Sequence, residues 1–201
     1  IITGDPYNIA NLETNISSKI LDSIYKSSNE NSFIKKNTQF DISNFENERN
    51  RINNIFRNSG IYNFSQDYIT FENDTIGKKN SVDVKLNIPN KLTRAGDTLI
   101  QEPFKPYTIK EVNIFTDASY KNRIQLKSNK TLTYNGFNFY NYEKLEYNPK
   151  SIINAVQITK GNLYSDLDKT RTYRYLNALN IFKYPNIEYI ENANDSSLIT
   201  N

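Results

Sequence analysis

The sequence contains no histidine and no cysteine, and these two absences remove most of the usual chemistry of enzyme active sites. Histidine is the commonest general base and a common metal ligand. Without cysteine there are no disulfides, thiolate nucleophiles or cysteine metal sites. The sequence also has no glycine-rich phosphate loop, dinucleotide fingerprint or hydrolase nucleophile elbow. We therefore expect this chain not to be an enzyme and to hold no cofactor and no metal.

Paired carboxylates are the one catalytic arrangement that this composition leaves open. The candidate pairs are Asp166 with Asp168 and Asp67 with Glu72. Asp166 and Asp168 fall in the first turn of a predicted helix, where acidic side chains stabilise the helix dipole. We favour that capping role, and a glycan-active enzyme fragment with two catalytic carboxylates is the less favoured alternative.

The chain also lacks methionine and any long apolar run. Because it begins Ile-Ile-Thr, we expect it to be a piece of a longer protein. No stretch approaches the roughly 20 apolar residues that a membrane helix needs, and no signal peptide is recognisable. We expect any membrane segment or targeting signal to lie outside this sequence.

The charge distribution argues against nucleic acid as a partner. The 25 basic and 22 acidic residues are interspersed along the chain and leave a net charge of +3. Nucleic-acid-binding domains instead gather basic residues on one face. The 15 tyrosines and 11 phenylalanines supply apolar surface for a folded core, which argues against disorder.

Two stretches of the chain follow the same order of structural signals. Each opens with Pro-Tyr and an isoleucine, at Pro6-Tyr7 and Pro106-Tyr107, and continues with a short helix signal, a second helix and strands. Such self-similarity indicates repeated modules. We predict an α+β fold of two tandem β-α-α-β-β modules, spanning residues 6–90 and 106–201, each a small mixed sheet covered by two helices.

The first module is predicted from local signals. We expect a strand over residues 7–12, a helix over 16–25, and a second helix that Asp41 caps and Gly60 ends. Phe40 and Phe45 can staple its start. Its apolar stripe comprises Ile42, Phe45, Ile52, Ile55 and Phe56. Strands over 62–71 and 82–88 should form a hairpin, followed by a polar linker over 89–106.

Two pairs of opposite charges on the second helix, Glu46 with Arg49 and Glu48 with Arg51, are spaced i,i+3. We interpret both as solvated surface pairs. Arg49 interrupts the apolar stripe, so we expect it to reach a partner domain.

The second module is predicted to open with a strand over 107–115 and to carry an insertion at about 117–147. Asn135-Gly136 between strand-prone arms indicates a hairpin inside that insertion, and this hairpin is a second candidate for setting the orientation of the modules. Asn148 and Ser165 are predicted helix caps, and Asn180 a helix stop. The expected inward-facing residues of the longer helix are Leu167, Leu176 and Leu179. A strand should run to Ile190, and residues 196–201 should begin a last strand that stays incomplete.

Motifs at the two ends of this longer helix resemble those of POTRA domains. They are Lys160-Gly161-Asn-Leu-Tyr164-Ser165 and Leu176-Asn-Ala-Leu179-Asn-Ile-Phe182. The run from Tyr147 to Ile152 is similar to the last such domain before the barrel in the BamA/TamA superfamily. Phe40-Asp41, Glu48-Arg49-Asn-Arg51-Ile52 and Arg57-Asn-Ser-Gly60-Ile-Tyr62 resemble the preceding domain of TamA-like members. Asn37 and Asn180 depart from the pattern, which often has glycine at the first position.

The resemblance implies a periplasmic arm of an outer-membrane assembly factor in a diderm bacterium. Its implied partners are unfolded outer-membrane proteins, accessory assembly subunits and a membrane β-barrel continuous with the chain. The implied mechanism is β-augmentation, in which a client strand pairs with a sheet edge. The edges by analogy are residues 62–71 and 183–189, with the candidates Tyr62, Phe64, Gln66, Tyr68, Thr70, Lys183, Tyr184, Asn186 and Glu188. A passive spacer or adhesin-like module is the alternative.

Overall fold

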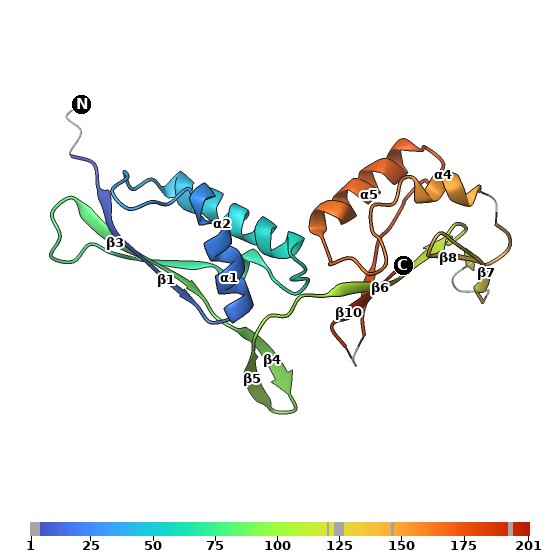
Figure 1. The fold of residues 1–201 in the computed structure, drawn as a ribbon, viewed down its shortest axis with the longest axis horizontal. Coiled ribbons are helices and arrows are strands. Elements are labelled where there is room, and N and C mark those ends of the chain that lie inside the picture. The colour runs from blue at the N-terminus through green and yellow to red at the C-terminus, as the bar shows by residue number, and fades with distance from the viewer. Residues whose placement is uncertain (1–4, 120, 123–126, 146, 193–194) are drawn as a thin grey trace. The chain divides into compact units, whose positions relative to one another are not determined.

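A computed structural model describes residues 5–119, 121–122, 127–145, 147–192 and 195–201. The chain divides into two compact units, of which the first comprises the residues up to Arg57 together with Asn63–Lys105. The second comprises Asn58–Tyr62 together with Pro106–Asn201. Both units combine small sheets with helices, so the predicted α+β class is confirmed (Figure 1).

The first unit is built on a mixed three-stranded sheet in the order β1-β3-β2. Strand β1 (Asn8–Ile16) runs parallel to β3 (Ser81–Ile88), and β2 (Thr70–Asp74) pairs antiparallel with β3. Helices α1 (Lys19–Ser27) and α2 (Ile42–Asn58) lie against this sheet (Figure 1). Short 3₁₀ turns occur at Asn29–Asn31 (η1) and Gln66–Tyr68 (η2).

Strand β3 is the centre of this unit because it is buried between two neighbours. Its side chains alternate between half-buried and fully buried, as a strand with one face on a core must. The buried face consists of Val82, Val84, Leu86 and Ile88. This alternation and the β2–β3 hairpin match the pattern predicted from sequence.

The local signals around α2 act as expected. The Asp41 carboxylate accepts a hydrogen bond from the Ser43 backbone N–H at 2.8 Å, and the rings of Phe40 and Phe45 lie 4.9 Å apart. Gly60 adopts a left-handed φ of 94° just after the helix. The predicted apolar stripe is wrong at Ile42, because this first residue of α2 is 77% exposed.

The predicted strand over residues 62–71 is wrong for most of its length, since β2 begins only at Thr70. The preceding residues form an irregular segment with the η2 turn. Its apolar side chains fill the core instead of alternating on a sheet: Phe64 and Ile69 are 1% and 2% exposed. The ring of Phe64 packs edge-on against Phe56 at 4.9 Å. Core packing thus overrides the strand preference of these residues.

The predicted polar linker over residues 89–106 is also wrong. It contains an antiparallel hairpin of β4 (Lys91–Ala95) and β5 (Thr98–Glu102), which pair with each other and with no further strand in the described part of the chain. Gly96 supplies the left-handed residue of its turn. Figure 1 shows this hairpin projecting from the sheet of the first unit. Beyond it, Phe104 is buried and packs on Phe64, with ring centroids 5.2 Å apart.

The second unit is built on a five-stranded sheet in the order β7-β8-β6-β10-β9. Its strands are β6 (Thr108–Phe115), β7 (Asn129–Tyr134), β8 (Phe137–Asn141), β9 (Tyr189–Glu191) and β10 (Ser197–Thr200). Strand β6 runs parallel to both of its neighbours. The predicted β7–β8 hairpin is present, with Asn135 and Gly136 both at positive φ. Part of the predicted insertion lies outside the described residues.

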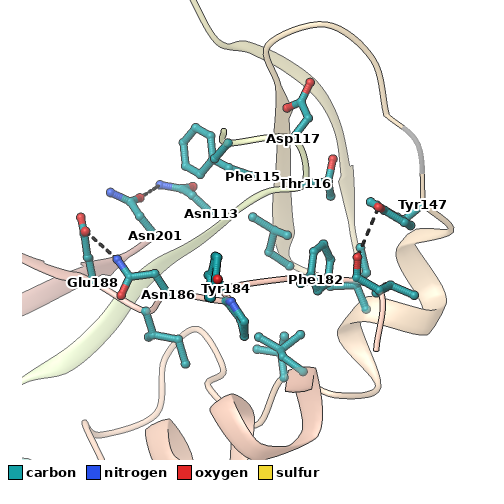
Figure 2. A pocket seen from close by; sticks show the side chains of 18 of the residues that line it. Asn113, Phe115, Thr116, Asp117, Tyr147, Phe182, Tyr184, Asn186, Glu188 and Asn201 are labelled. Carbon is teal, nitrogen blue, oxygen red and sulfur yellow. Dashed lines mark hydrogen bonds between the residues drawn. The ribbon is translucent and has the colours of Figure 1, made fainter. Parts of the chain in front are cut away.

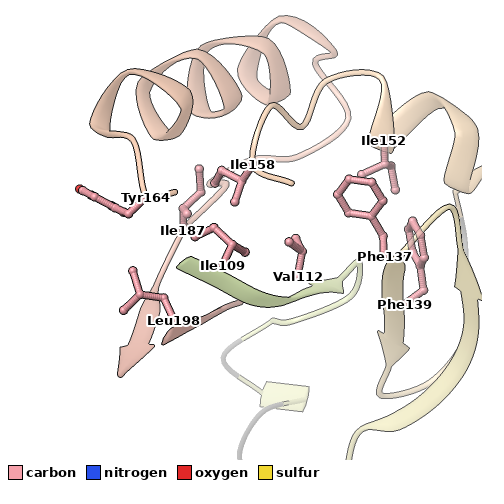
Figure 3. Packing of buried hydrophobic residues seen from close by; sticks show 9 residues of the cluster. All are labelled: Ile109, Val112, Phe137, Phe139, Ile152, Ile158, Tyr164, Ile187 and Leu198. Atoms are coloured by element: carbon pink, nitrogen blue, oxygen red, sulfur yellow. The ribbon is translucent and has the colours of Figure 1, made fainter. Parts of the chain in front are cut away.

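Helices α4 (Pro149–Ile153) and α5 (Asp166–Ala178) cover one face of this sheet. Nine apolar side chains lie between the helices and the strands (Figure 3): Ile109, Val112, Phe137, Phe139, Ile152, Ile158, Tyr164, Ile187 and Leu198. The predicted caps are confirmed, because the side chains of Asn148 and Ser165 accept from backbone N–H groups two and three residues on.

The interior face of α5 differs from the prediction. Leu167 is 45% exposed, Leu176 and Leu179 are half-buried, and Thr172 is the buried side chain of the helix. The predicted stop at Asn180 is confirmed by its φ of 55°. Asn37 likewise adopts a φ of 64°, so asparagine takes the left-handed conformation at both positions where the sequence departs from the family pattern.

The predicted strand over residues 183–189 is wrong, because β9 begins at Tyr189. Pro185 cannot donate to a strand ladder, and Tyr184 is 82% exposed, so the chain here follows the surface of the unit. At the end of this segment, Glu188 exchanges backbone hydrogen bonds with Asn201, and Tyr189 pairs with Thr200.

Candidate functional site

Strand β2 forms a free edge of the first sheet. It pairs with β3 from Thr70 opposite Asn87 to Asp74 opposite Asp83, and the strand order places no strand of the described chain on its other side. Four of its five side chains are exposed. A strand at a sheet edge directs every second N–H and C=O outwards, where another extended segment can pair with them.

The inner face of β2 is fixed by Phe71. Its ring packs edge-on against Phe45 at 5.1 Å, and the Arg49 guanidinium lies 5.6 Å from the ring centroid. These contacts hold the strand on α2, so its free edge is attached to a packed scaffold. Arg49 also pairs with Glu46 at 3.6 Å, as predicted for a solvated pair. Its expected role toward a partner domain stays a prediction.

Charges gather at the far end of β2. Lys78 Nζ lies 2.9 Å from Asp74 and 2.6 Å from Asp83, which closes the turn between β2 and β3. These hydrogen bonds raise the pKa of Lys78 and lower the pKa of both carboxyl groups. All three groups are therefore charged at neutral pH, and negative charge marks this end of the edge.

Strand β9 is the corresponding edge of the second sheet and is only three residues long. The ring of Tyr189 packs against Tyr164 at 5.2 Å and Tyr62 at 5.7 Å, and Lys169 lies over it at 5.6 Å. The side chain of Glu191 accepts from the Tyr107 hydroxyl at 2.8 Å. This edge is therefore short and its side chains are engaged in packing.

The predicted edge residues do not lie together on one strand. Thr70 is the one member that belongs to a strand, and it is exposed on β2. Phe64 is a core residue and Tyr62 lies in the tyrosine cluster of the second unit. Gln66 and Tyr68 form the η2 turn. Lys183, Tyr184, Asn186 and Glu188 are exposed and lie before β9.

Glu48 and Arg51 form an ion pair that is buried. The interpretation of Glu48 and Arg51 as a solvated pair is wrong, because their side chains are 1% and 9% exposed. The Glu48 carboxylate also accepts from the Ser32 hydroxyl and the Phe33 backbone N–H at 3.0 and 2.9 Å. Arg51 donates to the Ser28 carbonyl oxygen at 3.0 Å. Helix α2 thereby holds the segment that follows α1.

Two of the carboxylates considered for catalysis, Asp166 and Asp67, accept hydrogen bonds from side chains two residues before them. Asp166 accepts from the Tyr164 hydroxyl at 2.7 Å, and Asp168 is the residue whose N–H donates to the Ser165 cap. Asp67 accepts from Ser65 within the η2 turn. Among the residues that the structure describes, no group of three acidic side chains is placed to hold a metal ion. No helix in the described ranges has the length and apolar character that crossing a membrane requires.

Comparisons with known proteins identify structures with a similar fold. No family model matches the sequence, and no curated protein matches it. BamA from Haemophilus ducreyi lacking POTRA domains 1–3 is 10% identical, with a TM-score of 0.59 over 96% of this chain and 28% of that one. POTRA domains 3 to 5 of Haemophilus influenzae BamA are 11% identical, with a TM-score of 0.49 over 97% of this chain and 59% of that one.

The chain thus spans about a quarter and about three fifths of the lengths of these two structures. The fold is shared with the H. ducreyi structure, at a TM-score of 0.59. At 10% identity this likeness concerns architecture and carries no activity. The chain has an α+β fold that is shared with a part of BamA, as its sequence motifs indicated.

Proposed function

We propose that this chain is a client-handling arm in the periplasm, belonging to an outer-membrane β-barrel assembly factor closer to TamA-like than to BamA-like members. Its partners are unfolded outer-membrane proteins, accessory assembly subunits and a membrane β-barrel continuous with it. The fold shared with BamA and the motifs around Gly161 and Leu176 support this proposal. The single observation that carries it is the free, scaffolded edge of β2.

The proposed mechanism is addition of a client strand to β2. The edge offers backbone groups over Thr70–Asp74, while Phe71 anchors the strand from its inner face. Backbone pairing tolerates many client sequences, and exposed side chains at alternate positions bias the choice among them. Strand β9 offers a shorter second edge over Tyr189–Glu191. These ranges replace the longer edges expected from sequence.

A passive spacer is the second candidate, and the charges of β2 favour it. Glu72 and Asp74 are exposed on the edge strand. Natural proteins use charged side chains and short strands to keep sheet edges from pairing with other chains. On this alternative, the acidic side chains protect β2 and the chain only sets a distance between other parts of the protein.

Backbone NMR of the 201-residue chain, titrated with a peptide from the C-terminal strand of an outer-membrane barrel protein, separates the two candidates. Client handling predicts shifts concentrated in Thr70–Asp74, with smaller shifts in Tyr189–Glu191. A peptide of the same composition with a central proline is the control. Shifts elsewhere, or none at millimolar peptide, would reject client handling at these edges and leave the spacer.

Two proline variants refine this test. Neighbouring residues of a strand direct their N–H groups to opposite sides. Of Glu72→Pro and Asn73→Pro, one therefore removes a donor from the free edge and the other removes a donor from the β3 ladder. Amide exchange of the unchanged chain identifies which is which, because the ladder amide is protected. The edge variant should lose peptide binding while keeping its unfolding midpoint.

A further inference from the structure

Strand β1 forms the other edge of the first sheet, opposite β2. The segment before α2 closes the start of this edge. The Ile9 N–H donates to the Thr38 carbonyl oxygen at 2.9 Å, and the Ile9 carbonyl oxygen accepts from the Asn37 N–H at 2.8 Å. Beyond Ile9, the described residues supply no further backbone partner on this side of β1. Most of the nine-residue strand therefore has an open edge.

The open edge carries outward-directed backbone groups at alternate residues. The Ser17 N–H donates to the Ile88 carbonyl oxygen of β3, so residues in phase with Ser17 face the sheet. A bulge at Ala10 shifts this phase relative to Ile9. The residues that direct their N–H and C=O groups outwards are Leu12, Thr14 and Ile16. Their side chains lie on the side of the sheet that bears the helices, opposite the buried residues of β3.

The second unit shows the equivalent edge closed by a strand. Strand β6 pairs with β10 in the register in which β1 pairs with β3, including a bulge at Lys110. The side chain of Asn113 bonds to Asn201 on one side (Figure 2) and to Asn138 of β8 on the other, each at 3.0 Å. Strand β8 thus occupies the side of β6 that corresponds to the open side of β1.

Burial at matching positions shows what the open edge leaves uncovered. Val112 of β6 is 3% exposed, whereas Leu12, the corresponding residue of β1, is half-buried. Ile16 is half-buried as well. The residues opposite Leu12 and Ile16 on β3 are fully buried, namely Val84 and Ile88. Apolar surface therefore remains accessible on the edge side of β1 and not on the side of β3.

The β4–β5 hairpin presents apolar surface that fits this edge. Leu92 lies opposite Gln101 and diagonal to Leu99, so these two hairpin leucines share one face. Both are exposed, and neither strand of the hairpin has a further neighbour in the described chain. Unpaired strands with exposed apolar side chains favour pairing with another sheet edge.

The turn of the hairpin determines how β4 can pair with β1. Residues that flank a two-residue turn bond to each other, so Ala95 and Thr98 direct their backbone groups into the hairpin. Leu92 and Arg94 are in the other phase and direct theirs outwards. Antiparallel pairing sets such residues opposite the outward-directed residues of β1. Both hairpin leucines then lie on the helix-bearing side of the sheet, against the half-buried residues of β1.

Charge also favours β4 as the pairing strand. Glu13 is the only charged residue of β1. Strand β4 carries Lys91 and Arg94, whereas β5 carries Glu102. In the antiparallel pairing, Lys91 lies on the face of the sheet that bears Glu13, because both side chains point away from the helices. Opposite charges on neighbouring strands stabilise their pairing.

A second copy of the chain can supply this hairpin, whereas the chain's own hairpin is too closely tethered. Strands β1 and β3 end side by side, and Pro89 and Asn90 alone connect β3 to β4. The peptide units of this connection span at most about 10 Å. Reaching the outer side of β1 requires two strand spacings of about 4.8 Å each and a path around the connection to α1 at Ser17-Ser18. Short connections of this kind favour exchange of an element between copies.

We propose that the first unit mediates reciprocal dimerisation, in which β4 of each copy pairs antiparallel with residues 12–16 of the other copy. The three-stranded sheet of each copy gains the two strands of the hairpin from its partner. The hairpin leucines cover Leu12 and Ile16, and Lys91 approaches Glu13 on the other face. The interface is isologous and closes on a twofold axis, so the assembly stops at two copies. This inference is independent of the proposed function, which uses β2.

Sedimentation equilibrium of the 201-residue chain from micromolar to millimolar concentration tests this assembly. We expect a monomer at low micromolar concentration and a monomer–dimer equilibrium above it. Thr14→Pro removes an outward N–H group of β1 and leaves the ladder with β3 intact. It should weaken dimerisation at least tenfold and keep the urea midpoint of the monomer. Leu92→Asn should also weaken dimerisation at least tenfold, and Leu167→Asn, at an exposed leucine of α5, is the matched control that should not.

Exchanged charges identify the two strands that pair. Glu13→Lys and Lys91→Glu should each weaken dimerisation about fivefold, since each places like charges on neighbouring strands in both halves of the dimer. An equimolar mixture of the two variants should form mixed dimers as tightly as the unchanged chain dimerises. In the mixed dimer, each β4–β1 contact again joins one lysine to one glutamate.

A chain that stays monomeric at millimolar concentration would overturn the proposal. So would a dimer that Thr14→Pro leaves intact, because the copies would then associate through their hairpins alone or through another surface. A mixture of the two charge variants that dimerises no more tightly than either variant by itself would equally exclude pairing of β4 with β1.

Discussion

Arg51 donates to Glu48 through two nitrogens, with Nε 2.9 Å from Oε2 and Nη2 2.5 Å from Oε1, and the Glu48 side chain is 1% exposed. Removing one partner of a buried pair leaves a charge without compensation. We predict that Arg51→Met lowers the free energy of unfolding by about 3–5 kcal/mol. Urea denaturation followed by far-UV circular dichroism measures the change.

Arg49→Met on the same helix is the matched control, because its pair with Glu46 is exposed. It should cost about 1 kcal/mol or less, including the loss of its contact with the Phe71 ring. If both variants lowered the free energy of unfolding by the same amount, the burial of Glu48 would not add to the cost of removing its partner.

Tyr25 lies beside this pair and should make stability fall at high pH. Burial, assisted by the Glu48 carboxylate, raises the pKa of Tyr25 from 10.0 to about 12. The folded state thus favours the neutral phenol, so this contribution is complete below pH 10 and is lost as pH rises toward 12. The loss is on the order of 2–3 kcal/mol at 1.36 kcal/mol per pKa unit. The quantity to measure is the difference in unfolding free energy between the unchanged chain and Tyr25→Phe from pH 9 to 12, because contributions that the two chains share cancel in this difference. A difference that does not change with pH would contradict this assignment.

Gly60 should tolerate no side chain. Its φ is 94°, and an added Cβ would meet Pro106 Cβ at 3.1 Å and Leu163 Cδ2 at 3.2 Å. We predict that Gly60→Ala destabilises the second unit by about 1–3 kcal/mol through backbone strain and crowding. Gly77→Ala is the control, with a similar positive φ and open space around it. Thermal unfolding of the two variants separates crowding from backbone strain, and an identical shift in both would exclude crowding at Gly60.

The β4–β5 hairpin should open far more readily than the sheet beside it. Two-stranded hairpins are marginal in water, and Leu92 and Leu99 are 56% and 69% exposed. Native-state hydrogen exchange should show amides of Lys91–Glu102 exchanging at least a hundredfold faster than those of β3. Comparable protection in both elements would show that the hairpin is held by contacts outside its own ladder.

The features predicted correctly from sequence depend on neighbouring residues. Asp41, Ser165 and Asn148 cap helices, and Asn135-Gly136 makes a hairpin turn, because each conformation is set within about four residues. The α+β class follows from such signals taken in order. Burial of Glu48 could not be predicted in the same way, since its partners Ser32 and Phe33 are distant in sequence.

The missed strand boundaries have the same origin. Phenylalanine favours strands, which is why Phe64 was included in the predicted strand. In the structure its ring packs in the core against Phe56 and Phe104. Pro185 indicates that the second edge begins after it, because proline cannot donate a hydrogen bond to a strand ladder. The alternation of Lys91–Ala95 and Thr98–Glu102 around Gly96 could likewise have revealed the extra hairpin. Strand β2 pairs with β3 at the edge of the sheet, and most residues of the first predicted edge lie outside β2.

The bulges at Ala10 and Lys110 mark the one place in each of β1 and β6 where the strand can lose a residue and keep its register. Each bulge adds one residue to a parallel pair without adding one to the partner strand. Deleting the bulge residue would leave Leu12 two positions after Ile9, or Val112 two positions after Ile109, which is the spacing of a regular strand, so both side chains would still face the core. Homologous sequences should therefore tolerate a one-residue gap at Ala10 or Lys110, and should otherwise vary in length in the connections, for example around Gly96 or Gly136.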